Sequence, residues 1–170
     1  MGRARALRPL PLLGLLAACA TGEPELPPPP CPRVAFIHGV EAVEDYPGAS
    51  DAQRFAVRLS GIRGGCRYEQ GGVSLAYSFD LLVDLLAGTA PEVLEVPYFV
   101  SVLDERGRLL DKKRFVARVG FAGGRRAGVR EHIEQRLEGA DEKVGPAWRI
   151  LISLDLPTER ALELWRRRSL

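Results

Sequence analysis

The feature that most constrains the fold is a strict alternation of apolar and polar side chains between Val73 and Leu85. Large apolar residues occupy every second position: Val73, Leu75, Tyr77, Phe79, Leu81, Val83 and Leu85. Small or acidic residues fill most positions between them: Ser74, Ser78, Asp80 and Asp84. Successive side chains of a strand point to opposite faces, so the segment predicts a β-strand with one face in a core and the other in water.

Shorter alternations predict the other strands of the same domain. They lie at 55–60, 96–104, 108–119, 150–156 and, with a weaker pattern, 34–43. The glycine-rich stretch 61–72, which contains Cys66, is expected to form a turn. Gly107 stands where a hairpin loop at 105–107 needs a positive φ.

One segment has a mixed pattern. Val129, Ile133 and Leu137, within Gly128 to Glu138, fit both a strand face and a helix stripe at i, i+4 and i+8. We interpret this segment as a strand.

A short helix is expected at the C-terminus. Thr158 can cap it, and Glu159 suits the positive end of its dipole. Ala161, Leu162 and Trp165 share one side, which we expect to pack on the rest of the domain.

These elements define one domain of mainly β class. Six or seven short strands and one terminal helix predict an immunoglobulin-like antiparallel β-sandwich over 34–157, followed by a helix at 158–170. The buried tryptophan between two core cysteines that antibody domains carry is absent, so the immunoglobulin-like assignment is architectural.

The N-terminus has the pattern of an export signal. In residues 1–18 a start containing Arg3, Arg5 and Arg8 precedes an apolar run too short to span a bilayer. The run ends at Leu16-Ala17-Ala18-Cys19, which resembles the lipobox of bacterial lipoproteins. That resemblance implies cleavage before Cys19, acylation of Cys19, and, with Ala20 rather than Asp next, export to the outer membrane. An ordinary secretory signal whose cleavage site abuts a cysteine is the alternative.

Residues 19–33 are expected to form a tether. They contain six of the thirteen prolines of the chain: Pro24, Pro27, Pro28, Pro29, Pro30 and Pro32. Consecutive prolines favour polyproline II, a semi-rigid spacer of about 3.1 Å per residue. A proline-rich ligand for a partner domain is the alternative.

The charge of the mature chain argues against nucleic-acid binding. The whole chain has a net charge of +2, but without the three leader arginines 21 basic residues face 22 acidic ones. A protein held by phosphate contacts would carry a basic excess in its folded part.

The chain has three cysteines, and acylation of Cys19 would leave two of them, Cys31 and Cys66, with thiols that can pair. In an oxidising compartment Cys31 and Cys66 predict one disulfide, with free buried thiols as the alternative. Their spacing does not support a metal site, because no second cysteine pair or histidine cluster accompanies them.

Four segments carry a wider resemblance. Cys31 to Gly39, Leu59 to Tyr68, Pro97 to Val100 and Glu131 to Arg136 together resemble a group of uncharacterised proteobacterial outer-membrane lipoproteins with a cysteine-stapled β domain. The resemblance covers most of 31–156 and implies no particular reaction.

The sequence contains few residues in patterns that catalysis or metal binding requires. His132 lacks the second histidine of a zinc-binding HExxH motif, and His38 has no ligand beside it. Asp80 and Asp84 share strand parity and could pair, as carboxylates on a polar strand face often do. The glycine-rich segment 120–124 lacks the ending of a phosphate-binding loop. We therefore expect no catalytic residue, metal or other cofactor.

Two basic clusters stand out in the mature chain. Arg125, Arg126 and Arg130 form one; Arg166, Arg167 and Arg168 form the other, a candidate contact for an anionic surface. Cations in a last helical turn also suit the helix dipole, which gives the second cluster a local explanation.

The sequence thus favours a non-enzymatic lipoprotein on the periplasmic side of the outer membrane. We expect it to contact the bilayer through acylated Cys19 and to act as an interaction or assembly module for an envelope protein. The competing interpretation is an envelope hydrolase or polymer-modifying enzyme that uses His38 or His132.

Overall fold

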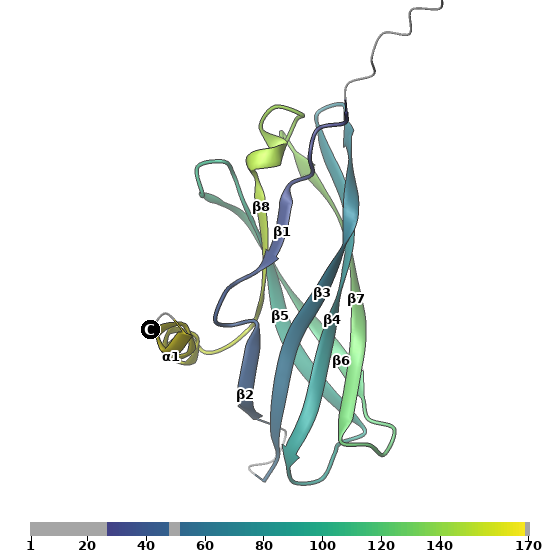
Figure 1. Ribbon diagram of the computed structural model, residues 1–170, viewed down its shortest axis with the longest axis vertical. Helices are drawn as coiled ribbons and strands as arrows, with labels where there is room; N and C mark the ends of the chain where they lie inside the picture. The colour runs from purple at the N-terminus through teal and green to yellow at the C-terminus, as the bar shows by residue number, and fades with distance from the viewer. Residues whose placement is uncertain (1–26, 48–51, 169–170) are drawn as a thin grey trace, which may run out of the picture.

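Two four-stranded sheets face each other in the computed structural model, which describes residues 27–47 and 52–168 (Figure 1). The first sheet, sheet A, has the order β1 (Arg33–Phe36), β8 (Arg149–Leu154), β5 (Val93–Leu103) and β6 (Leu109–Gly120). The second, sheet B, has the order β2 (Ala42–Pro47), β3 (Arg54–Glu69), β4 (Gly72–Ala87) and β7 (Arg126–Glu138). A 3-10 turn, η1 (Gly145–Ala147), precedes β8, and helix α1 (Thr158–Arg168) follows it. The predicted sandwich with a short C-terminal helix is confirmed.

The alternation in β4 produces the core as expected. Val73, Phe79 and Leu81 are fully buried between the sheets. Phe79 lies at the centre, where its ring meets Phe36 of β1 and Tyr98 of β5 edge to face at centroid distances of 5.9 and 5.3 Å. Such aromatic pairs add to the free energy gained by burying their apolar area.

The opening strand differs from its prediction. Instead of one strand over 34–43, β1 ends at Phe36 and β2 begins at Ala42, in the other sheet. Gly39, with a φ of +87°, lies in the turn between them. β1 pairs with β8 in parallel, whereas all other strand pairs are antiparallel among the described residues.

The expected turn at 61–72 is also wrong, because β3 continues to Glu69 and only Gln70 and Gly71 turn the chain. The register between β3 and β4 shifts between Ser60 and Arg63, where Gly61 takes a φ of +68°. This β-bulge places one extra residue in β3 and reverses which side chains face the core. Odd-numbered residues face inward before it and even-numbered residues after it, so the alternation is hidden in the sequence.

The predicted hairpin loop at 105–107 and the predicted strand at 128–138 are confirmed. The hairpin between β5 and β6 closes on buried Asp104, which accepts hydrogen bonds from the backbone N–H groups of Arg106 and Arg108 at 2.9 and 2.8 Å. Gly107 has a φ of +77°. The ambiguous segment 128–138 is a strand, part of β7, paired along its whole length with β4.

Helix α1 begins at Thr158 as predicted but packs through a different side. Leu162 and Trp165 leave 46% and 52% of their surface exposed, whereas Leu164 packs against the core. The backbone of α1 approaches Gly39, where an added Cβ would lie 3.2 Å from the Cα of Trp165. The helix backbone at Trp165 thus lies against the β1–β2 turn, while the side chain of Leu164 packs against the core.

Candidate binding groove and tether junction

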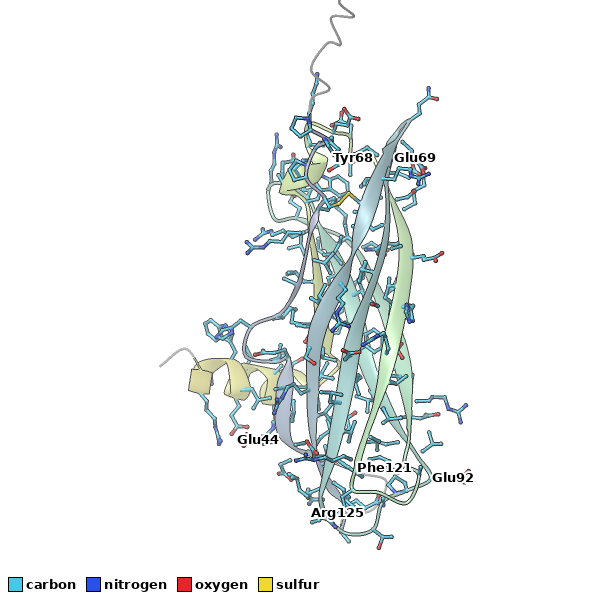
Figure 2. The ribbon with its side chains drawn as sticks, turned by 45° about the vertical axis from the view of Figure 1, so that its right-hand side comes forward. Glu44, Tyr68, Glu69, Glu92, Phe121 and Arg125 are labelled. Atoms are coloured by element: carbon cyan, nitrogen blue, oxygen red, sulfur yellow. A yellow bond between two sulfur atoms is a disulfide. The ribbon has the colours of Figure 1, made fainter. Side chains whose placement is uncertain are left out.

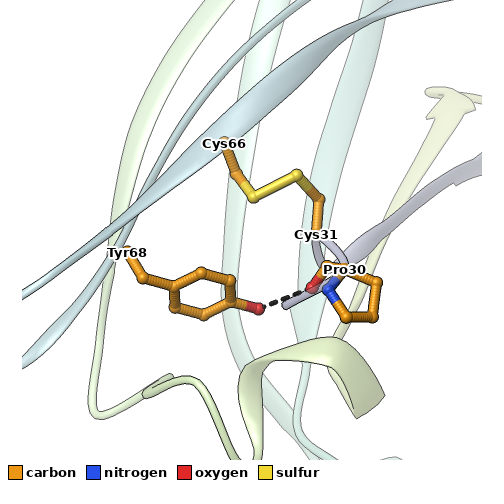
Figure 3. Close-up of a disulfide and its surroundings, with 4 residues drawn as sticks. All are labelled: Pro30, Cys31, Cys66 and Tyr68. Atoms are coloured by element: carbon orange, nitrogen blue, oxygen red, sulfur yellow. Dashed lines mark hydrogen bonds between the residues drawn. A yellow bond between two sulfur atoms is a disulfide. The ribbon is translucent and has the colours of Figure 1, made fainter. Parts of the chain in front are cut away.

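The tether meets the sandwich at one end, where a covalent bond holds it. Cys31 forms a disulfide with Cys66 of β3, with Cα atoms 5.6 Å apart, so the predicted pairing is confirmed (Figure 3). The bulge in β3 is the reason that Cys66 points inward, toward the segment that leads into β1. Cys19 and the leader lie outside the described residues.

A second contact fixes the same junction. The hydroxyl of Tyr68 donates a hydrogen bond to the carbonyl oxygen of Pro30 at 2.8 Å (Figure 3). Burial, with Glu142 and Asp141 nearby, raises the pKa of Tyr68, which keeps the hydroxyl protonated as a donor. Figure 2 shows Tyr68 and Glu69 at this end of the molecule and Phe121 and Arg125 at the opposite end. The last prolines of the tether are therefore fixed to the β3–β4 hairpin.

The outer face of sheet B carries a groove along its interior strand β4. In the half of β4 next to the β3–β4 hairpin, the outward residues are small: Ser74, Ala76 and Ser78. Long side chains stand beside them on the neighbouring strands, Arg63 and Arg67 on β3 and His132, Glu134 and Arg136 on β7. A row of small residues between two rows of long ones forms a trough.

The hollow is sizeable and continuous. Gly65, Ala76 and Glu134 line a space of about 910 Å³, and a second space of about 300 Å³ continues it past Ser78 and His132. An added Cβ at Gly65 would meet no atom within 4 Å. The hollow is shallow and widely open to solvent, so a ligand in it would lie along the sheet face and would not be enclosed.

The two walls of the groove differ in their ion pairs. On β7, Arg126 and Arg130 bind Asp84 and Asp80 at 2.6 and 2.7 Å, and Arg136 binds Glu138 at 2.7 Å and also Glu69.

On β3, Arg63 comes no closer than 3.9 Å to Asp80. Arg58 and Arg67 form no ion pair or side-chain hydrogen bond with any other residue of 27–47 and 52–168. On the β3 wall, Arg58 and Arg67 therefore have no ion-pair partner among the described residues, whereas Arg63 shares Asp80 with Arg130.

Asp80 and Asp84 share the outer face of β4, as their parity predicted, but each binds an arginine. The hydrogen bond from Arg130, reinforced by the charges of Arg130 and Arg63, lowers the pKa of Asp80. Asp80 is thus a poor general acid near neutral pH.

The basic clusters found in the sequence are partly neutralised. Arg125 donates to the carbonyl oxygens of Leu85 and Leu86 at the end of β4. In α1, Arg160 and Arg167 both bind Glu163, and the hydrogen bond from Arg160 is the main cause of the lowered pKa of Glu163. Arg166 is exposed, and the side chain of Arg168 lies outside the description.

The two histidines lie on different parts of the fold. His38 is exposed in the turn between β1 and β2, and His132 is exposed on the outer face of β7, in the groove. Within the described ranges no cluster of three or more His, Cys, Asp or Glu side chains could hold a metal ion. No helix in that part of the chain has the length and apolar character to cross a membrane.

Sequence reasoning missed the groove. Arg63, Gly65 and Arg67 share a face only because of the bulge, and Ser74 and Ala76 lie between long side chains only once β3 and β7 flank β4. The signal was the run of small residues at every second position of β4. No known family, curated protein or solved structure matches the chain.

Proposed function

We propose that the protein is a non-catalytic binding module of the bacterial cell envelope, held on the periplasmic side of the outer membrane through acylated Cys19. Its binding surface is the groove on the outer face of sheet B. The observation that carries this proposal is the groove itself, a trough of small side chains beside Arg67, which has no ion-pair partner among the described residues, and Arg63, whose ion pair with Asp80 is long, at 3.9 Å.

The tether junction supports the same proposal. The disulfide and the Tyr68 hydrogen bond attach the chain to the hairpin whose outer face carries the groove. A pull on the tether would therefore reach the sheets through this junction.

Anchoring is tested by fractionation of the native host. The variant Cys19→Ser should accumulate as unprocessed precursor or leave the membrane fraction, because multiple acyl chains supply the membrane affinity. Processing and membrane retention like those of the wild type would contradict the lipid anchor.

The binding role is tested by complementation of a deletion strain. Ala76→Trp should fill the groove and abolish function, whereas the matched control Ala122→Trp, at an exposed residue between β6 and β7, should complement. Melting temperatures of both variants report whether they fold.

The enzyme alternative predicts a different pattern. His132 lies in the groove, which is the observation in its favour. Full complementation by His38→Ala and by His132→Asn, which keeps a neutral polar side chain in place, would exclude it. Loss of function in either variant, with an unchanged melting temperature and with Ala76→Trp still active, would replace the binding module with the enzyme.

A further inference from the structure

The groove lies on an interior strand, which limits what it can recognise. β4 pairs with β3 on one side and with β7 on the other, from Gly72–Glu138 to Asp84–Arg126 on the β7 side. Its backbone N–H and C=O groups are therefore engaged, and a ligand in the groove meets side chains. A peptide that adds as an extra strand needs a free sheet edge, which this position does not offer.

Positive charge is spaced along one wall. Arg63 and Arg67 are four residues apart on β3, which corresponds to about 13 Å along a strand. Arg58 lies on the other side of the bulge, beside a separate hollow of about 360 Å³ that Glu41, Glu44 and Asp84 also line, so the positive row of this groove consists of Arg63 and Arg67. Guanidinium groups bind carboxylates and phosphates in a two-pronged geometry, so the row suits a chain with anionic groups at intervals.

The floor and the other wall offer neutral and acidic hydrogen-bonding groups. Ser74 and Ser78 place hydroxyls along the floor, and Ser74 donates its proton to Glu69 at 3.2 Å, which leaves its oxygen free to accept. Glu134 stands opposite Ala76 and has no ion-pair or hydrogen-bond partner among the described residues. A carboxylate accepts hydrogen bonds and repels other anions. The β7 wall therefore suits hydroxyl donors.

We propose that the groove binds an anionic glycan whose sugar carboxylates contact Arg63 and Arg67 while its hydroxyls donate to Glu134. A uronic-acid chain carries both kinds of group along its length. An acidic peptide supplies the carboxylates but few hydroxyl donors, and its charge would face Glu134. This inference deepens the proposed function, since it names the ligand class of the same groove.

Calorimetry with purified full-length protein in detergent tests the inference. The probes are galacturonic-acid oligomers, neutral malto-oligosaccharides and poly-L-glutamate. We expect binding of the galacturonate oligomers, weakened by added salt, and no binding of the other two. The double variant Arg63→Gln/Arg67→Gln should bind about tenfold or more weakly. The matched control Arg106→Gln/Arg118→Gln removes the same charge from exposed sites of the β5–β6 hairpin and should bind like the wild type.

Several results would overturn the glycan assignment. Absence of galacturonate binding, equal weakening by both double variants, or binding of poly-L-glutamate in its place would each do so. If the oligomers fail to bind while Ala76→Trp still abolishes complementation, the ligand class is wrong and the binding module stands. If Ala76→Trp complements fully, the proposed function itself falls.

Discussion

The outer faces of the two sheets both carry charged side chains, but they differ in what lies between those side chains. On sheet A the outward residues of β5 include Phe99, and the Nζ of Lys112 lies 3.8 Å from the centre of its ring. Arg114, opposite Phe99, binds Asp155 at 2.5 Å. Ser101 and Ser153 are buried although they belong to this outer face.

On sheet B the corresponding interior strand carries Ser74, Ala76 and Ser78, and the long side chains beside them leave a trough. On β5 the large side chain of Phe99 stands next to Ser101 on the outer face, whereas β4 has no large outward side chain from Ser74 to Ser78. The predictions that follow test how the two sheets are joined and what each face contributes.

The largest effect is expected at the covalent link. Cys31 precedes β1 of sheet A, and Cys66 lies in β3 of sheet B, so their disulfide joins the two sheets. Replacing both by serine should lower the free energy of unfolding by about 2–5 kcal/mol, as measured by denaturant titration. If reductant lowers the free energy of unfolding of the wild-type protein by the same amount, the loss in the variant is due to the missing disulfide. Two alkylatable thiols in non-reduced protein would contradict the link.

The next largest effect is expected at a hydrogen bond between the sheets. The hydroxyl of Tyr98 in β5 donates to Oε2 of Glu131 in β7 at 2.6 Å, and burial, with this bond, raises the pKa of Tyr98. Tyr98→Phe keeps the buried ring but leaves the carboxylate without its donor, and should cost about 1.5–3 kcal/mol.

Tyr77→Phe is the matched control. The oxygen of Tyr77 accepts a longer bond, 3.3 Å, from Gln135, so its loss should cost less. An equal or larger loss in Tyr77→Phe would show that the Tyr98 bond does not join the sheets in the way we describe.

A smaller effect is expected where α1 meets the sandwich. Leu164 packs against the core, whereas Leu162 is 46% exposed. Leu164→Ala should cost about 1 kcal/mol, lowering the melting temperature by roughly 2–4 °C, and Leu162→Ala should cost less than about 0.5 kcal/mol. A larger loss in Leu162→Ala than in Leu164→Ala would show that the helix packs through the side of Leu162, as the sequence pattern indicated.

The smallest effect is a pH dependence on the face of sheet B. Because Arg130 lowers the pKa of Asp80 in the folded state, this carboxylate contributes stability above its unfolded pKa, about 4. That contribution is lost as the pH falls through the lower folded value. Asp80→Asn should therefore flatten the stability profile below about pH 4 and leave its shape unchanged above about pH 6. A wild-type slope in the variant would contradict this.

The sequence predicted the parts of the fold in which side-chain types follow a regular or local pattern. The alternation around Phe79, the hairpin loop at 105–107 and the helix start at Thr158 are local signals, and the elements that they predict are present. The pairing of Cys31 with Cys66 followed from the cysteine count and was also correct.

The errors share a physical cause, which is a local break in a regular pattern. The bulge at Gly61 reverses the alternation of β3, so an extended strand resembles a glycine-rich turn. Gly39 lies in the turn where the opening strand changes sheets, and the backbone of α1 comes close to it, a long-range contact that the helical pattern does not contain. The groove depends on three strands at once, which no single segment specifies.

The most direct test of the central claim asks which outer face is occupied in the cell. A photo-crosslinking amino acid is placed at Glu134, in the groove of sheet B, or at Val116, which is 45% exposed on the outer face of sheet A. In native membranes we predict an adduct from position 134 that disappears when Ala76→Trp fills the groove, and none from position 116. An adduct from position 116, or one from position 134 that survives Ala76→Trp, would contradict the assignment of the binding surface to sheet B.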